Sequence, residues 1–121
     1  MSRIWLTLVA LAAAVALVIP TTGSTASEAT PLLTGTVGPG FTITLKKGTT
    51  RVRTLRAGTY RIRVTDRSNL HDFRLKGSTN KAITGVAFQG TKTVTVTLRR
   101  GTVTYFCSPH ATAMKGTFRV T

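Results

Sequence analysis

The sequence predicts an all-β domain built as a two-sheet sandwich, and three features of the chain support this. In several short stretches every second residue is apolar, as in strands with one buried and one exposed face. Threonine, valine and isoleucine recur in these stretches, and glycines interrupt the chain every several residues. Helical periodicity does not appear between the strands. Short strands at this spacing are typical of a sandwich.

The N-terminal region differs from the rest of the chain and predicts an export signal. Residues 4–19 follow Arg3 and contain one polar side chain, Thr7, and residues 24–26 fit the small-residue pattern before a cleavage site. The apolar run is shorter than the roughly 20 residues that a stable membrane span needs. We therefore expect residues 1–26 to be a Sec-type signal peptide, with a retained anchor as the alternative. A short mobile lead-in is expected at residues 27–31.

Residues 32–121 are expected to form one domain of short strands. Alternation is clearest at 41–46, at 59–65, where arginines occupy the outer face, and at 92–98, where threonines do. The glycines between such stretches predict the turns that separate them. We expect strands at residues 32–37, 41–46, 51–55, 59–65, 70–75, 82–87, 92–98, 102–107 and 116–121.

The composition excludes several kinds of functional centre. The chain has 121 residues, with 17 Lys+Arg against 3 Asp+Glu, 2 His and 1 Cys. A single cysteine forms no internal disulfide, four-cysteine zinc site or iron–sulfur cluster. Two histidines cannot supply a multinuclear copper centre, and three acids leave little for a pair of catalytic carboxylates. We therefore expect the protein not to be an enzyme.

The scarce metal-binding side chains gather in one short segment. Cys107, His110 and Met114 lie between two expected strands, and His71 lies in an earlier one. Two imidazoles, a thiolate and a weak axial thioether form the ligand set of an electron-transfer copper site. Pro109 should stiffen the segment because its ring fixes its own φ. Taken singly, His71 could be structural, the cysteine a buried apolar residue or reactive thiol, and Met114 part of the core.

The motif Cys107-Ser108-Pro109-His110 with Met114, and His71-Asp72-Phe73 upstream, resembles the cupredoxin family of plastocyanin, pseudoazurin and amicyanin. The small secreted bacterial members are the most similar. The resemblance implies a Greek-key β-sandwich that holds one type 1 copper at one end. It also implies the roles of individual residues: His71, Cys107 and His110 as equatorial ligands, Met114 as axial ligand, and Pro39, Pro109 and Ala111 as an apolar patch where the electron leaves.

Two details depart from the family pattern. The Cys-x-x-His-x-x-x-Met spacing is intermediate between the longer plastocyanin loop and the shorter amicyanin loop. Asp72 stands where the family usually has asparagine, and it can accept but not donate a hydrogen bond when ionised. We expect Asp72 and Ser108 to support the ligands from the outer shell, and the charge of Asp72 to favour Cu(II) and lower the reduction potential.

These features lead to three functional hypotheses. The first is an exported blue copper protein, monomeric, that carries single electrons to or from an acidic redox partner in the periplasm, cell envelope or medium. The second is a copper storage or delivery protein that uses the same ligands without redox cycling. The third is a basic sandwich that binds an anionic cell-envelope polymer or lipid headgroups, because a net charge of +14 attracts anions. Nucleic-acid binding is not expected, since the sequence predicts no aromatic stacking platform.

Overall fold

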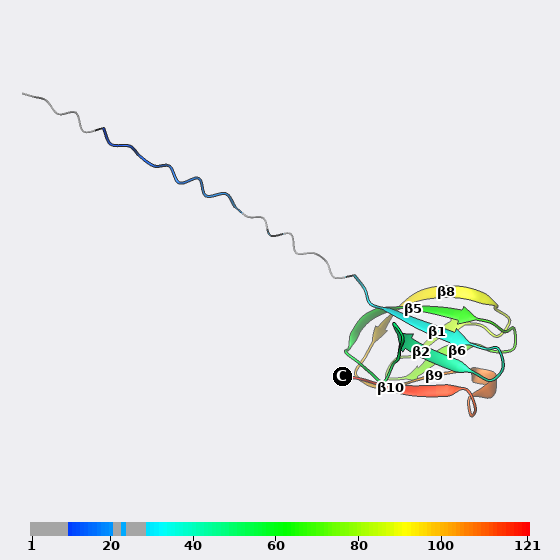
Figure 1. The fold of residues 1–121 in the computed structure, drawn as a ribbon. Coiled ribbons are helices and arrows are strands. Elements are labelled where there is room, and N and C mark those ends of the chain that lie inside the picture. The colour runs from blue at the N-terminus through cyan, green and yellow to red at the C-terminus, as the bar shows by residue number, and fades with distance from the viewer. Residues whose placement is uncertain (1–9, 21–22, 24–28) are drawn as a thin grey trace, which may run out of the picture.

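The computed structural model describes residues 10–20, 23 and 29–121, and all strands lie in the last of these ranges (Figure 1). Of the predicted signal peptide, residues 1–9, 21–22 and 24–26 lie outside the described residues, as do residues 27–28 of the predicted lead-in. Residues 10–20 are exposed and form neither helix nor strand. Within the described ranges, no helical segment has the length and hydropathy to cross a membrane.

The strands form two five-stranded sheets that face each other, as the sequence predicts. The first sheet, sheet A, has the order β3 (Thr50–Arg51), β2 (Ile43–Lys47), β1 (Leu32–Val37), β5 (Gly58–Asp66) and β8 (Gly90–Leu98). The second, sheet B, has the order β4 (Thr54–Leu55), β10 (Lys115–Val120), β9 (Gly101–Phe106), β6 (Phe73–Gly77) and β7 (Lys81–Thr84). The pairs β1–β5 and β4–β10 are parallel, and the remaining neighbours are antiparallel.

The core lies between the sheets and is formed by the inward residues of the alternating stretches. In β5, Ile62 and Val64 are fully buried, whereas the arginines beside them are exposed. Phe73 of β6 stacks on Tyr105 of β9 with ring centroids 6.0 Å apart. These apolar contacts supply most of the driving force for folding and hold the strand ends in fixed positions.

Several strand predictions are wrong in their bounds, and two of these lie before residue 56 and have local reasons. The segment predicted as one strand at 51–55 is two short strands, because the chain crosses from sheet A to sheet B at Val52 and Arg53. The strand predicted at 41–46 begins at Ile43. Residues 38–42 form a tight turn in which the Gly38 N–H donates to the Thr42 carbonyl at 2.9 Å. Gly38 and Gly40 have φ of 68° and 71°, which glycine adopts without steric cost.

Four loops meet at one end of the sandwich, which we call the loop end: residues 38–42, 67–72, 85–89 and 107–114. The strand register places three of them together, since Val37 is paired with both Ile43 and Asp66, and Asp66 with Gly90. The fourth joins them because Phe106, just before it, is paired with Arg74, just after the loop at 67–72. Strand β6 begins at Phe73, so His71 lies in a loop and not in the strand predicted at 70–75. Likewise β7 ends at Thr84, short of the predicted residue 87. The opposite, or far, end contains the turns at 48–49, 52–53, 56–57, 78–80 and 99–100.

Candidate metal centre

Cys107 occupies the position directly after β9 and points into the sandwich. It continues the inward face of Val103 and Tyr105, and its side chain is fully buried. Its backbone is still extended, with φ −99° and ψ 122°. A 3₁₀ turn, η1 (Ser108–His110), follows at once and changes the direction of the chain. The thiol therefore lies at the rim of the core, where the loop end begins.

The loop from 107 to 114 is closed by its own backbone. The Cys107 N–H donates to the Met114 carbonyl at 3.0 Å, and the Met114 N–H donates to the His110 carbonyl at 2.8 Å. Pro109 lies near the start of η1, where a fixed φ suits the turn. Cys107, His110 and Met114 are thus fixed relative to one another by one compact turn. The Met114 side chain is buried.

A different loop supplies His71. The carboxylate of Asp66, at the end of β5, accepts the Ser68 N–H at 3.2 Å, and the Ser68 hydroxyl accepts the Leu70 N–H at 3.1 Å. These bonds bend the chain back toward the loop end. His71 follows and is buried. Such local side-chain-to-backbone bonds are what favour turns over strands in segments rich in aspartate and serine.

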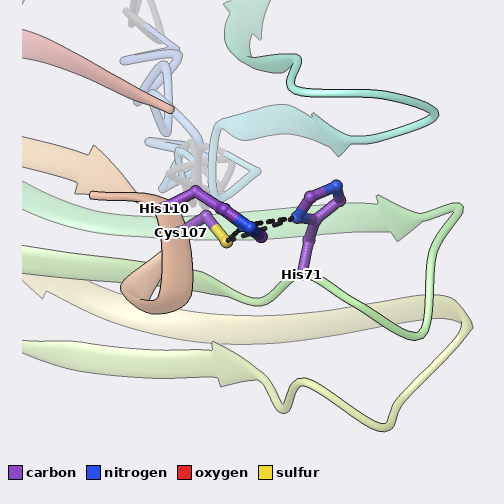
Figure 2. A group of neighbouring side chains, drawn as sticks. All are labelled: His71, Cys107 and His110. Atoms are coloured by element: carbon purple, nitrogen blue, oxygen red, sulfur yellow. Dashed lines mark hydrogen bonds between the residues drawn. The ribbon is translucent and has the colours of Figure 1, made fainter. Parts of the chain in front are cut away.

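The two loops bring three donor atoms together (Figure 2). The Nδ1 atoms of His71 and His110 are 3.0 Å apart, and the Sγ of Cys107 lies 3.6 Å from each of them. Metal bonds to histidine nitrogen and cysteine sulfur are about 2.0–2.3 Å long, so ligand atoms that share one ion are separated by roughly 3–4 Å. The observed separations have this size. A thiolate with two imidazoles matches the donor preference of copper.

Burial affects the protonation of the thiol. Loss of solvation raises the pKa of Cys107, and this outweighs the opposing effect of hydrogen bonds from the backbone of Asp72 and His110, while the carboxylate of Asp72 raises the pKa further. The metal-free protein therefore holds the proton on sulfur at neutral pH. A metal ion that binds as a thiolate complex must displace this proton.

Asp72 links the two ligand loops. Its carboxylate accepts two hydrogen bonds from Ser108, one from the backbone N–H and one from the hydroxyl, each 2.5 Å long. Asp72 follows His71 in one loop, and Ser108 follows Cys107 in the other. Hydrogen bonds to a charged acceptor are stronger than neutral ones, and here they hold the two loops at a fixed separation.

Phe41 is a neighbour of the site that the alternation pattern does not reveal. Its ring contacts the rings of His110 and His71 edge to face, with centroids 4.9 Å and 5.7 Å away, yet 65% of the side chain is exposed. The alternation of 41–46 predicts a buried strand residue here. The turn signal that could have placed it correctly is the pair of glycines around Pro39.

The loop end is apolar around a partly accessible His110. Within residues 29–121, the exposed large apolar side chains are Phe41, Leu70 and Val86, and all three belong to its loops. His110 itself is half-buried. Of the residues expected to form the exit patch, Pro39 and Pro109 are exposed and Ala111 is half-buried.

The fold and the site define a class of protein: a two-sheet sandwich of the cupredoxin type with a Cys–His–His centre at one end. Residues 39–121 match the family described as copper binding proteins, plastocyanin/azurin family, and the chain belongs to this family. Its cofactor is one copper ion, and His71, Cys107 and His110 form a group that could hold it. Members of the family typically transfer electrons to redox partners. A comparison with curated proteins found no match.

Solved structures with low sequence identity share the fold. Rusticyanin from Thiobacillus ferrooxidans aligns with a TM-score of 0.53 at 20% identity, over 78% of this chain and 79% of that one. A methionine-to-glutamine mutant of rusticyanin gives a TM-score of 0.56 at 20% identity, over 78% and 80%. A laccase from Pediococcus acidilactici gives 0.55 at 15% identity, over 79% of this chain but 28% of the laccase. At these identities the likeness concerns the fold alone.

Proposed function

We propose that this protein is an exported type 1 copper protein that carries single electrons between redox partners and catalyses no reaction of its own. The observation that carries the proposal is the convergence of the His71 Nδ1, His110 Nδ1 and Cys107 Sγ atoms at the loop end, within 4.8 Å of one another. Ligands that the backbone bonds of their loops and the Asp72–Ser108 bonds hold in place need little rearrangement when a bound metal changes oxidation state. Small rearrangement is what rapid electron exchange requires.

In this proposal His71, Cys107 and His110 are the equatorial ligands and Met114 is the axial one. Met114 is supported by its burial and by the backbone bonds that tie it to Cys107 and His110 in one turn. When bound, copper would supply a one-electron couple between Cu(II) and Cu(I). The Asp72–Ser108 bonds hold the ligand loops in position through both states.

The loop end is the proposed docking surface for redox partners. His110 is the ligand nearest to solvent, and Phe41, Pro39, Pro109 and Ala111 would supply apolar contact area around it. Among the loop-end residues, Arg67 is the one basic side chain. The strong positive charge elsewhere would attract an acidic partner from a distance, and apolar contact at the loop end would then complete a brief complex.

Electron self-exchange between oxidised and reduced copies tests the carrier role. Two copies that meet at their loop ends should exchange electrons without losing copper. Phe41→Lys, which places a cation beside His110, should slow self-exchange because like charges then face each other. Arg99→Gln at the far end serves as a control and should leave the rate unchanged. Copper transfer to a metal-free acceptor without measurable self-exchange would instead indicate the storage or delivery role.

Export is proposed from the sequence, with residues 1–26 as the signal peptide. Expression of the full chain in a bacterial host, followed by N-terminal sequencing of the exported protein, tests it. A mature protein that begins near Ser27 is expected. An intact N-terminus on a membrane-bound protein would favour the retained anchor.

A further inference from the structure

The charges of the domain are distributed in an unusual way. Within residues 29–121 the carboxylate side chains are Asp66 and Asp72, and both are buried. Every lysine and arginine in the same range is exposed. The described surface of the domain therefore presents cationic side chains with no acidic side chain between them.

One groove combines these cations with hydroxyl and amide groups. It has a volume of about 390 Å³ and lies where the edge strand of sheet A, β8, faces the edge strand of sheet B, β7. Lys81 and Arg99 supply its charge, and hydroxyl and amide side chains supply the other polar groups. The remaining lining residues are Ser78, Thr79, Asn80, Thr95, Val96 and Thr97.

The groove is held in shape by bonds between its two walls. The Ser78 hydroxyl donates to the Arg99 carbonyl at 2.8 Å, and the Arg99 N–H donates to the Thr79 hydroxyl at 3.0 Å. These bonds join the turn at 78–80 to the end of β8. The two walls therefore form a fixed trough and not two independent loops.

A line of cations and hydroxyls leads from the groove onto the outer face of sheet A. Thr95 is paired with Arg61 of β5, and Thr93 is paired with Arg63. Both arginines are exposed, because the residues between them face the core. A chain that leaves the groove across β8 would next reach β5, which carries these two arginines and lies about 5 Å from β8, the spacing of neighbouring strands.

We propose that this groove, with Arg61 and Arg63 beyond it, binds a phosphate-bearing chain polymer. Guanidinium groups bind phosphate oxygens through paired hydrogen bonds, and hydroxyl and amide groups can donate to the oxygens between them. The groove is open and continues onto a sheet face, which suits a passing chain better than an enclosed small molecule. A flat lipid surface would touch one face and could not enter the trough.

The position of the groove would leave the candidate metal centre free when a polymer is bound. The groove lies at the far end of the sandwich, whereas His110 lies at the loop end. A protein bound to an anionic envelope polymer in this way would keep its copper site accessible to redox partners.

Binding of long-chain polyphosphate, measured by calorimetry at two salt concentrations, tests the proposal on the full mature protein with and without copper. Replacement of both groove cations, Lys81→Gln with Arg99→Gln, should weaken binding at least about tenfold, since each change removes a charge-assisted hydrogen bond to a phosphate oxygen. The matched control is Lys46→Gln with Arg51→Gln. This variant removes the same two charges from the opposite edge of sheet A and should weaken binding less.

Amide shifts in a ¹⁵N-labelled sample locate the bound chain. Polyphosphate should shift residues 78–81 and 95–99 and leave residues 107–114 unaffected. Equal losses of affinity in the two double variants, or shifts spread over both sheets, would overturn the proposal. They would show that binding depends on general charge attraction and not on the groove. Stronger binding to polyglutamate, to free phosphate or to anionic phospholipid vesicles would overturn the assignment of the ligand. A normal copper spectrum in any of these cases leaves the carrier proposal standing.

Discussion

The two ends of the sandwich differ in chemistry although the same strands connect them. The loop end contains the three donor residues and the large exposed apolar side chains of residues 29–121, with Arg67 as its one lysine or arginine. The turns of the far end contain no metal donor, and four arginines lie there: Arg53, Arg56, Arg99 and Arg100. A rigid framework thus lets one short chain separate a desolvated metal site from a strongly hydrated, charged surface.

Loss of the Cys107 thiol should have the largest effect, on the rise in melting temperature that copper causes. A substitution at the far end should not have this effect. We expect copper to raise the melting temperature of the native protein, and Cys107→Ala, which removes the one soft anionic donor, should abolish this rise. The far-end variant Arg100→Gln should keep the full copper-dependent rise. Differential scanning calorimetry with and without one equivalent of copper measures both, and a retained rise in Cys107→Ala would show that copper binds elsewhere.

The pH dependence of copper binding should reflect the buried thiol. The pKa of Cys107 is raised by burial, so in the metal-free protein the proton is lost only above the ordinary range of a thiol. Below that pKa each bound ion releases the thiol proton, and the affinity should rise about tenfold for each pH unit. A competition titration with a chelator between pH 6 and 8 measures this slope. An affinity independent of pH would show that sulfur is not a ligand.

Asp72 should contribute to stability at the loop end by a measurable amount. Asp72→Ala leaves the Ser108 N–H without its acceptor, and we expect a loss of about 2–4 kcal/mol in the free energy of unfolding. Asp72→Asn keeps an acceptor for the N–H and can donate to the Ser108 hydroxyl, so its loss should be smaller. Urea unfolding of the metal-free proteins compares them.

The same pair of variants tests the effect of the charge on the copper. Asp72→Asn removes a negative charge near the ligands, so its reduction potential should be higher than that of the native protein. Voltammetry of the copper-loaded proteins measures the difference. An unchanged or lower potential would contradict the hypothesis that the Asp72 charge favours Cu(II).

Replacement of Asp66 should have the smallest effect, a change in how the free energy of unfolding depends on pH. Burial raises the pKa of Asp66, and one of its carboxylate oxygens is buried without a hydrogen-bond partner. Its folded pKa lies above its unfolded value of about 3.8, so stability is lost as pH rises from that value through the folded pKa. Asp66→Asn cannot ionise, so its stability relative to the native protein should increase over this interval. Parallel stability curves for the two proteins would contradict this.

The sequence predicts the sandwich well because the local alternation of apolar residues marks the strands. It predicts the donor group well because few residues in the chain can bind copper. Alternation locates β5 and β8 closely, since each has one buried face. Because the chain has one cysteine and two histidines, a site with one thiolate and two imidazoles can be built from only one set of residues. The sequence wrongly places Phe41 in a strand, because the alternation of apolar residues already begins in the turn before β2. The strand assigned to His71 is wrong because serine and aspartate bonds bend residues 67–72 away from the sheet.

Titration of the metal-free protein with Cu(II), followed by visible and electron-paramagnetic-resonance spectroscopy, tests whether Cys107 and the two histidines form a copper site. We expect an intense visible absorption that reaches its maximum at one copper per chain, because the Cys107 thiolate donates charge to the ion. We also expect the resonance of a single type of copper, lost together with the colour in Cys107→Ser. A protein that stays colourless with bound Cu(II), or keeps the same spectrum in Cys107→Ser, would contradict this.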